Sequence, residues 1–109
     1  MSFKVVMLES AELDIKELRL YILNKFSIEI WNATFLKLKQ SIRTLQKFPM
    51  AGAIPEEMKK LNLTQYRQIL SGMNRIIYEK RQDVIYIHMI VDVRRDMNTV
   101  LLTRLLRTM

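Results

Sequence analysis

The chain contains no cysteine, and among its 109 residues there are only two glycines, two prolines and one histidine. Without cysteine there is no disulfide framework, no thiolate metal site and no thiol nucleophile. The isolated Gly52 and Gly72 do not form a glycine-rich loop for a phosphate group. One histidine, with no acidic cluster at ligand spacing, predicts no metal site. The sequence therefore does not describe a metabolic enzyme, and we expect no cofactor and no small-molecule substrate.

Long hydrophobic runs are also missing, because charged residues interrupt every apolar segment. No run approaches the roughly 18 residues that span a bilayer. The N-terminus lacks the basic stretch followed by an apolar one that is typical of a signal peptide. These features predict a cytoplasmic protein without membrane contact. Hydrophobic residues make up 50% of the chain, which is enough for one small core, so we expect a single domain over residues 1–109.

Charge of one sign is in excess: 18 Lys and Arg stand against 11 Asp and Glu, for a net charge of +7. The excess lies from Lys37 onward, whereas the charges nearly cancel before residue 28. Such a balance suits nucleic acid, an acidic protein surface or an acidic inhibitor as a partner. A soluble basic surface without a dedicated partner explains the charge equally well.

In the first half of the chain, apolar periodicity predicts a strand followed by two helices. Residues 3–8 form a largely buried strand, and Ser10 is placed to cap a helix that runs to about Lys25. Apolar residues at helical spacing predict a second helix over residues 28–47. The two-residue connection between the helices implies an antiparallel hairpin.

In the second half, turn-forming residues separate three expected strands. Both prolines lie in a loop of residues 49–62, and Glu56 to Lys60 are placed to form a helical turn after Pro55. Asp96 is positioned to cap a final helix. The three strands, joined by tight turns, span about residues 63–71, 74–81 and 83–92.

This order of elements predicts an α+β fold. It consists of an N-terminal strand, an antiparallel helical hairpin, a three-stranded antiparallel meander and a short C-terminal helix, with the helices on one face of an antiparallel sheet. Of the eight methionines, Met73, Met89 and Met97 either fill the core or line an adaptable binding groove.

Two kinds of function remain open from the residues alone. A metal-independent ribonuclease needs a base, an acid and cations around the phosphate. Only His88 or Tyr86 is placed to move protons, and His88 lies on an apolar strand, which is typical of a satisfied core histidine. The strand tyrosines Tyr66, Tyr78 and Tyr86 are expected to be half-buried with their hydroxyl groups at the surface.

The second kind of function is binding without chemistry. Arginine binds phosphates and carboxylates through its forked donors, and arginines are concentrated on the predicted strands and the last helix. We therefore predict no catalytic residue. The predicted contact set is Arg67, Arg75, Arg94, Arg95, Arg104 and Arg107.

Several segments of the sequence resemble the RelE/ParE superfamily of type II toxin–antitoxin toxins. They are Tyr66-Arg67 with Ser71-Gly72, the run from Asn74 to Tyr78, and Arg95-Asp96-Met97, supported by Ala11, Asp14, Leu45, Phe48-Pro49 and Gly52. The Tyr-Arg strand joined through Ser-Gly to a strand ending in Tyr is more similar to ParE than to RelE. The chain also resembles ParE in lacking the basic-plus-tyrosine set with which RelE cuts mRNA. One departure is Asp92, which stands where ParE-like chains often have histidine.

The resemblance implies a RelE/ParE-like fold and a growth-inhibiting toxin that binds and poisons DNA gyrase. It also implies a cognate antitoxin that neutralises the toxin. We expect the antitoxin to be acidic where it binds and to lay an apolar helix or strand across an exposed groove. Leu101, Leu102 and Leu105 are the residues that we expect it to cover, although we expect at least one of them to pack in the core. The alternatives are a ribosome-dependent mRNA endonuclease of RelE type and a simple nucleic-acid-binding domain.

Overall fold

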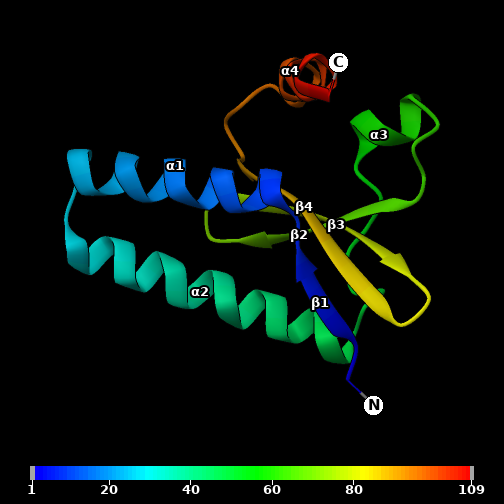
Figure 1. Ribbon diagram of the computed structural model, residues 1–109, viewed down its shortest axis with the longest axis horizontal. Coiled ribbons are helices and arrows are strands. Elements are labelled where there is room, and N and C mark those ends of the chain that lie inside the picture. The colour runs from blue at the N-terminus through cyan, green and yellow to red at the C-terminus, as the bar shows by residue number, and fades with distance from the viewer. Residues whose placement is uncertain (1, 109) are drawn as a thin grey trace.

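The computed structural model describes residues 2–108, and it describes side chains as far as Arg104. Figure 1 shows the long helical hairpin lying along one side of the sheet, with the last helix above the sheet. The elements are β1 (Lys4–Met7), α1 (Glu9–Lys25), α2 (Ile28–Lys47), α3 (Glu56–Lys60), β2 (Tyr66–Ser71), β3 (Asn74–Arg81), β4 (Val84–Asp92) and α4 (Met97–Thr108).

The predicted α+β fold and its antiparallel meander are confirmed. The sheet has the strand order β1-β4-β3-β2, in which β2, β3 and β4 are antiparallel neighbours. The expectation of a wholly antiparallel sheet is wrong, because β1 pairs with β4 in parallel. Both helices separate β1 from the meander, so no tight turn dictates the direction of this strand.

Helices cover both faces of the sheet, which corrects the expectation that they pack on one face. Alternate residues of β3 point to opposite sides. Ile76 and Tyr78 join the core beneath α1 and α2, whereas Ile77 joins a second core. In the second core, Met58 of α3 and Met97 of α4 pack against this other face. A central strand that is buried on both faces reads as a continuous apolar run, and Ile76-Ile77-Tyr78 is such a run.

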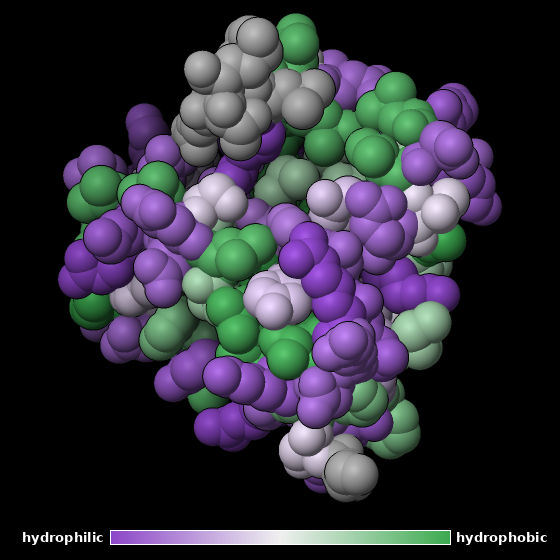
Figure 2. Space-filling view, turned by 45° about the vertical axis from the view of Figure 1, so that its right-hand side comes forward, coloured by the Kyte–Doolittle hydropathy of each residue, from purple (hydrophilic) through white to green (hydrophobic). Residues whose placement is uncertain are grey.

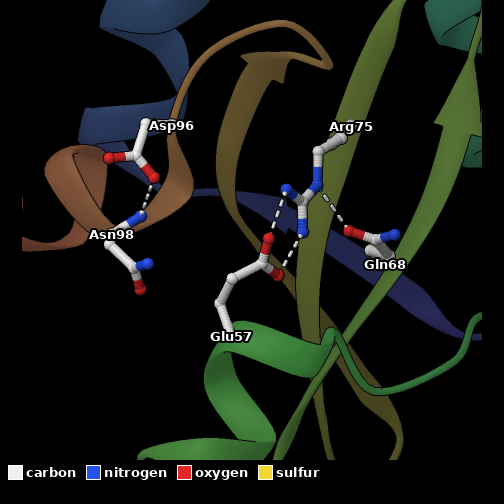
Figure 3. Close-up of polar contacts among 5 residues, drawn as sticks. All are labelled: Glu57, Gln68, Arg75, Asp96 and Asn98. Carbon is white, nitrogen blue, oxygen red and sulfur yellow. Dashed lines mark hydrogen bonds and ion pairs between the residues drawn. The ribbon is translucent and has the colours of Figure 1, made fainter.

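The start of α1 differs from the prediction, and the difference has a physical reason. The N-cap is Leu8, so Ser10 lies inside the first turn, where its hydroxyl donates to the His88 carbonyl at 3.1 Å. In contrast, Asp96 caps α4 as predicted, because its Oδ1 accepts the Asn98 amide hydrogen at 3.2 Å (Figure 3).

A bulge in β4 changes the direction of His88. Ile77 pairs with Met89 and Tyr78 pairs with Ile87, so His88 has no partner on β3. Beyond the end of β1, the first turns of α1 satisfy the free edge of β4: the amide of Ile90 donates to Asp14 Oδ2 at 3.0 Å. A bulge of this kind bends a strand and re-aims a side chain.

Tyr78 anchors the loop that follows α2. Its hydroxyl donates to the Pro49 carbonyl at 2.8 Å and accepts the Gly52 amide hydrogen at 3.0 Å. The ring is fully buried, so the expectation of a surface hydroxyl was wrong for this tyrosine. Burial raises the pKa of Tyr78. The loop lies so close to β2 that a Cβ on Gly52 would be 2.3 Å from the Gln68 carbonyl oxygen.

Candidate functional site

Arg75 of β3 is inside the molecule and is fully engaged there. Its Nε donates to Gln68 Oε1 at 2.6 Å, and its Nη1 and Nη2 donate to the two carboxylate oxygens of Glu57 at 3.2 and 2.9 Å (Figure 3). Only 8% of Arg75 is exposed. Hydrogen bonds from this guanidinium hold the pKa of Glu57 below its ordinary value. Arg75 therefore ties α3 to the sheet.

Two more of the predicted contact arginines bind other parts of the chain. Arg104 of α4 forms an ion pair with Asp14 of α1, and both side chains are largely buried. Arg67 Nη1 donates to the Gly52 carbonyl at 2.6 Å. Arg107 lies outside the described side chains. The structure thus does not bring the five described arginines of the predicted set together on one surface.

Arg94 and Arg95 are exposed, and they follow directly after β4. The side chain of Arg94 is 67% exposed, yet it is hydrogen-bonded to Asp92. The Arg94 amide and Nε donate to Asp92 Oδ1 at 2.8 and 2.9 Å, and Nη2 donates to Oδ2 at 2.8 Å. These bonds lower the pKa of Asp92 and raise that of Arg94. Asp92 therefore fixes the position of an exposed guanidinium.

The leucines that were expected to contact an antitoxin divide between core and surface. Leu101 is buried in the cluster that also contains Met58 and Val91. Leu102 is 59% exposed. Leu105 lies outside the described side chains. Adjacent residues of α4 point to different sides of the helix, so Leu101 and Leu102 do not form one exposed patch.

An apolar groove runs between the free end of the α1–α2 hairpin and the β2–β3 turn. It consists of two adjoining cavities of about 430 and 390 Å³, which share Tyr21 and Arg94 in their walls. Large apolar side chains from both sides of the groove are exposed to solvent, which is unusual for side chains of this size gathered in one place. They are Tyr21, Phe26, Ile30 and Met73.

The rim of the groove carries charges of both signs. Lys37 of α2 lies on one side, and Arg94 and Arg95 lie on the other. Three acidic residues, Asp14, Glu17 and Asp92, also line the groove. The hydroxyl oxygen of Ser71, on the groove wall, is buried and has no hydrogen-bond partner among the described residues. Asp92 and Asp14 are paired with Arg94 and Arg104. Lys37 and Arg95 at the edge of the apolar floor therefore suit an amphipathic segment that carries acidic residues.

Of the three methionines predicted to lie in the core or in a groove, two are in the core and one is in the groove. Met89 and Met97 are buried in the second core, whereas Met73 is 54% exposed and lines the groove. Flexible methionine at a binding surface adapts to the shape of its partner.

A second polar site, which the sequence analysis did not foresee, joins His88 to Glu79. His88 Nε2 lies 2.9 Å from Glu79 Oε1, and Arg81 Nη2 lies 2.9 Å from the same oxygen. Burial raises the pKa of Glu79, but hydrogen bonds from Arg81 and His88 outweigh it and keep that pKa low. Burial lowers the pKa of His88 against the opposing effect of Glu79. The missed signal was a glutamate and a histidine on two neighbouring strands, Glu79 on β3 and His88 on β4.

The described residues set limits on other kinds of site. Within residues 2–108, no group of three or more histidine and acidic side chains is arranged to hold a metal ion. None of the helices described combines the length and apolar character needed to cross a membrane.

Comparison with known proteins finds two similarities. The matching family description is "ParE toxin of type II toxin-antitoxin system, parDE", and the match covers residues 5–97. A solved structure described as "Chromosomal ParDE TA system from P. aeruginosa" superposes with a TM-score of 0.69 at 13% sequence identity, covering 84% of this chain and 96% of that chain. At that identity the likeness shows the fold alone. No curated protein matches the sequence.

Proposed function

The chain belongs to the ParE toxin family of type II toxin–antitoxin systems, and from this we propose that it arrests growth by binding DNA gyrase. The mechanism is stoichiometric binding that traps the cleaved-DNA state of the enzyme, with no chemistry by this chain. Gyrase is the target that the sequence resemblance implies. The observation that supports binding is the pair of exposed arginines after β4, because forked donors at the surface suit carboxylate and phosphate groups of a partner. We expect the toxin and its target to meet in the cytoplasm.

The exposed arginines are the best candidates for target contacts. Arg94 and Arg95 are accessible, and Asp92 holds the Arg94 guanidinium in place. Preorganised arginine loses less side-chain entropy when it binds an acceptor. Arg75 already has its acceptors inside the fold. Arg107 stays a predicted contact.

A cognate antitoxin neutralises the toxin by filling the groove. The matching segment is an amphipathic helix whose apolar side meets Phe26, Ile30 and Met73, and whose carboxylates meet Lys37 and Arg94. Occupying the groove also covers Arg94, so antitoxin and target compete for it. Leu102 is a further exposed position on α4.

Purified gyrase tests the target. With relaxed plasmid and ATP, the toxin is expected to reduce supercoiling and to accumulate double-strand breaks, in proportion to its concentration. Arg94→Gln and Arg95→Gln together should weaken both effects while the protein stays folded. Full supercoiling activity at a large molar excess of folded toxin would reject gyrase as the target.

Co-expression tests the antitoxin groove separately from the target. Phe26→Asp places a carboxylate in the groove, so the toxin should still arrest growth but escape the antitoxin encoded beside it. The matched control is Leu102→Asp, which puts the same charge on α4. If Leu102→Asp escapes neutralisation and Phe26→Asp does not, the antitoxin binds at α4 and the groove assignment is wrong.

One observation favours the second candidate, a ribosome-dependent mRNA endonuclease. The hydrogen-bonded His88 and Glu79 form a pair through which a proton can be exchanged, beside Tyr66 and Tyr86. Message cleavage on translating ribosomes that disappears with His88→Gln would support this candidate. Double-strand breaks with gyrase that persist in His88→Gln would support the first one.

A further inference from the structure

Over its other half, the face of the sheet that α4 covers has no helix of the two described cores packed on it, and Val6 and Tyr86 there are half-buried; we call this the bare half. Helices α3 and α4 pack on Ile77, Met89 and Val91, toward one end of the strands. Toward the other end, Val6 and Tyr86 belong to neither hydrophobic core of the described residues, although their neighbours on the opposite face do. Figure 2 brings this side forward and shows a small patch of hydrophobic and pale side chains framed by hydrophilic ones.

The strand register places aromatic side chains in a row that begins at Tyr66, which packs against the second core, and continues across the bare half to Tyr86. Tyr66 on β2 pairs with Glu79 on β3, Glu79 pairs with Tyr86 on β4, and Tyr86 pairs with Val6 on β1. Since neighbouring strands are about 4.8 Å apart, the two tyrosines lie about 10 Å from each other on the same face. The bulge adds His88, whose ring meets that of Tyr66 edge to face at a centroid distance of 4.9 Å.

A row of cations lies next to the aromatic row. Arg81 pairs with Val84, which pairs with Lys4. The Arg81 guanidinium carbon lies 5.1 Å from the centroid of the Tyr86 ring, and its Nη2 bonds the Glu79 carboxylate. The guanidinium thus offsets the one negative charge in the row while 60% of its side chain stays exposed.

We propose that this bare half of the sheet binds single-stranded nucleic acid by stacking unpaired bases on Tyr86 and Tyr66. Bases stack on tyrosine rings and on guanidinium planes, and this contact accepts any base because each has a flat face. Arg81 and Lys4 meet the phosphates, and the Glu79–His88 pair presents polar atoms to a base edge. The bases of a duplex show only their edges in the grooves, so a sheet of this kind needs unpaired bases. The inference does not depend on gyrase as the target.

Direct binding tests this inference on the purified chain. The probes are fluorescein-labelled oligo-dT and oligo-U of about 12 nucleotides, which is within the span of one such site, and a DNA duplex of the same length. Fluorescence anisotropy should show that both single strands, or one of them, bind more tightly than the duplex. Binding of oligo-dT alone or of oligo-U alone identifies which nucleic acid the site takes.

Tyr86 variants make the test specific to the site. Tyr86→Leu should weaken single-strand binding at least about fivefold, which is the lower limit for losing one stacked base, whereas Tyr86→Phe keeps the ring and should bind as the unmodified chain does. Tyr21→Leu, at a surface tyrosine in the groove, is the matched control and should have no effect. Thermal unfolding checks that each variant is folded.

Salt dependence gives a second measurement that does not need Tyr86. Arg81→Gln should lower the slope of log affinity against log salt by about 0.7, the value for one phosphate contact on a single strand. The inference is overturned if duplex and single strands bind equally, if Tyr86→Leu and Tyr21→Leu weaken binding by the same factor, or if no single strand binds at low salt.

Discussion

The α3/α4 side of the sheet and the free end of the helical hairpin use arginine in opposite ways. On the sheet, Arg75 is 8% exposed and its three donor atoms are bound by Glu57 and Gln68. At the hairpin end, the Arg94 side chain is 67% exposed, and its ion-pair partner, Asp92, is two residues away in the chain. A buried guanidinium holds distant segments together, whereas an exposed one is held ready for a partner. Burial and acceptors, not residue type, separate the two roles.

The largest expected effect comes from removing the buried guanidinium. Arg75→Met leaves the Glu57 carboxylate and the Gln68 amide without their partner, so the free energy of unfolding should fall by about 3 kcal/mol. Urea unfolding measures this loss. Arg94→Met is the matched control and should unfold with the unmodified chain. The double variant Arg75→Met/Glu57→Met should recover much of the loss, because no uncompensated charge remains. Equal midpoints for Arg75→Met and Arg94→Met would remove the distinction between the two arginines.

The two glycines give the next contrast, because Gly52 lies in the packed loop after α2 and Gly72 lies in the β2–β3 turn beside the groove. A Cβ on Gly52 would meet the Gln68 carbonyl oxygen at 2.3 Å and the Tyr78 hydroxyl at 2.8 Å, so Gly52→Ala should cost about 3 kcal/mol by displacing the loop. A Cβ on Gly72 would meet only the Lys37 side chain, at 3.6 Å, but the backbone has φ of +58°. Gly72→Ala should therefore cost about 1 kcal/mol. Thermal unfolding ranks the two, and a larger loss at Gly72 would contradict the packing seen around Gly52.

Most of the fold follows from the sequence because its signals are local. Helical spacing, the proline-containing loop and the Ser71-Gly72 turn predicted the elements in the correct order. The direction of β1 was missed, since it depends on a partner about 80 residues away. The second core was also missed, because Met58 and Met97 show no pattern that says which face they cover.

The candidate site was harder to predict than the fold. The exposed Arg94 and the buried Arg75 look alike in the sequence, because both sit beside apolar strand residues. Their difference comes from Glu57, which reaches Arg75 only once α3 has folded over the sheet. The groove could not be predicted from the sequence either, because it forms only when the fold brings Phe26 and Met73, which are far apart in the chain, close together.

Measuring stability against pH separates the contributions of His88 and Glu79, which lie on the same face of the sheet. Burial lowers the pKa of His88 in the folded protein, so below its ordinary value of 6.5 the unfolded chain binds the proton more readily. Stability should therefore decrease as pH falls from 7 through 6.5 toward the folded pKa. The low pKa of Glu79 adds a further loss below about pH 4.5. His88→Gln should remove the first loss and keep the second, as measured by urea midpoints across pH. An unchanged slope between pH 7 and 5 in His88→Gln would place its origin elsewhere.

The smallest effect on stability is expected from substituting Arg94. The same substitution gives the most information about function. Its side chain faces solvent, so Arg94→Gln should leave the urea midpoint unchanged. Its charge lies at the rim of the groove, and charges there act on the rate of encounter with an acidic partner. Association with the antitoxin should slow several-fold at low ionic strength and converge with the unmodified chain at high ionic strength, because salt screens exposed charges. Stopped-flow or surface-binding kinetics at two salt concentrations measure this. A slower association that persists at high salt would mean that Arg94 acts through a close contact in the complex. Arg94 would then neither hold the fold together, as Arg75 does, nor act only by long-range attraction of the partner.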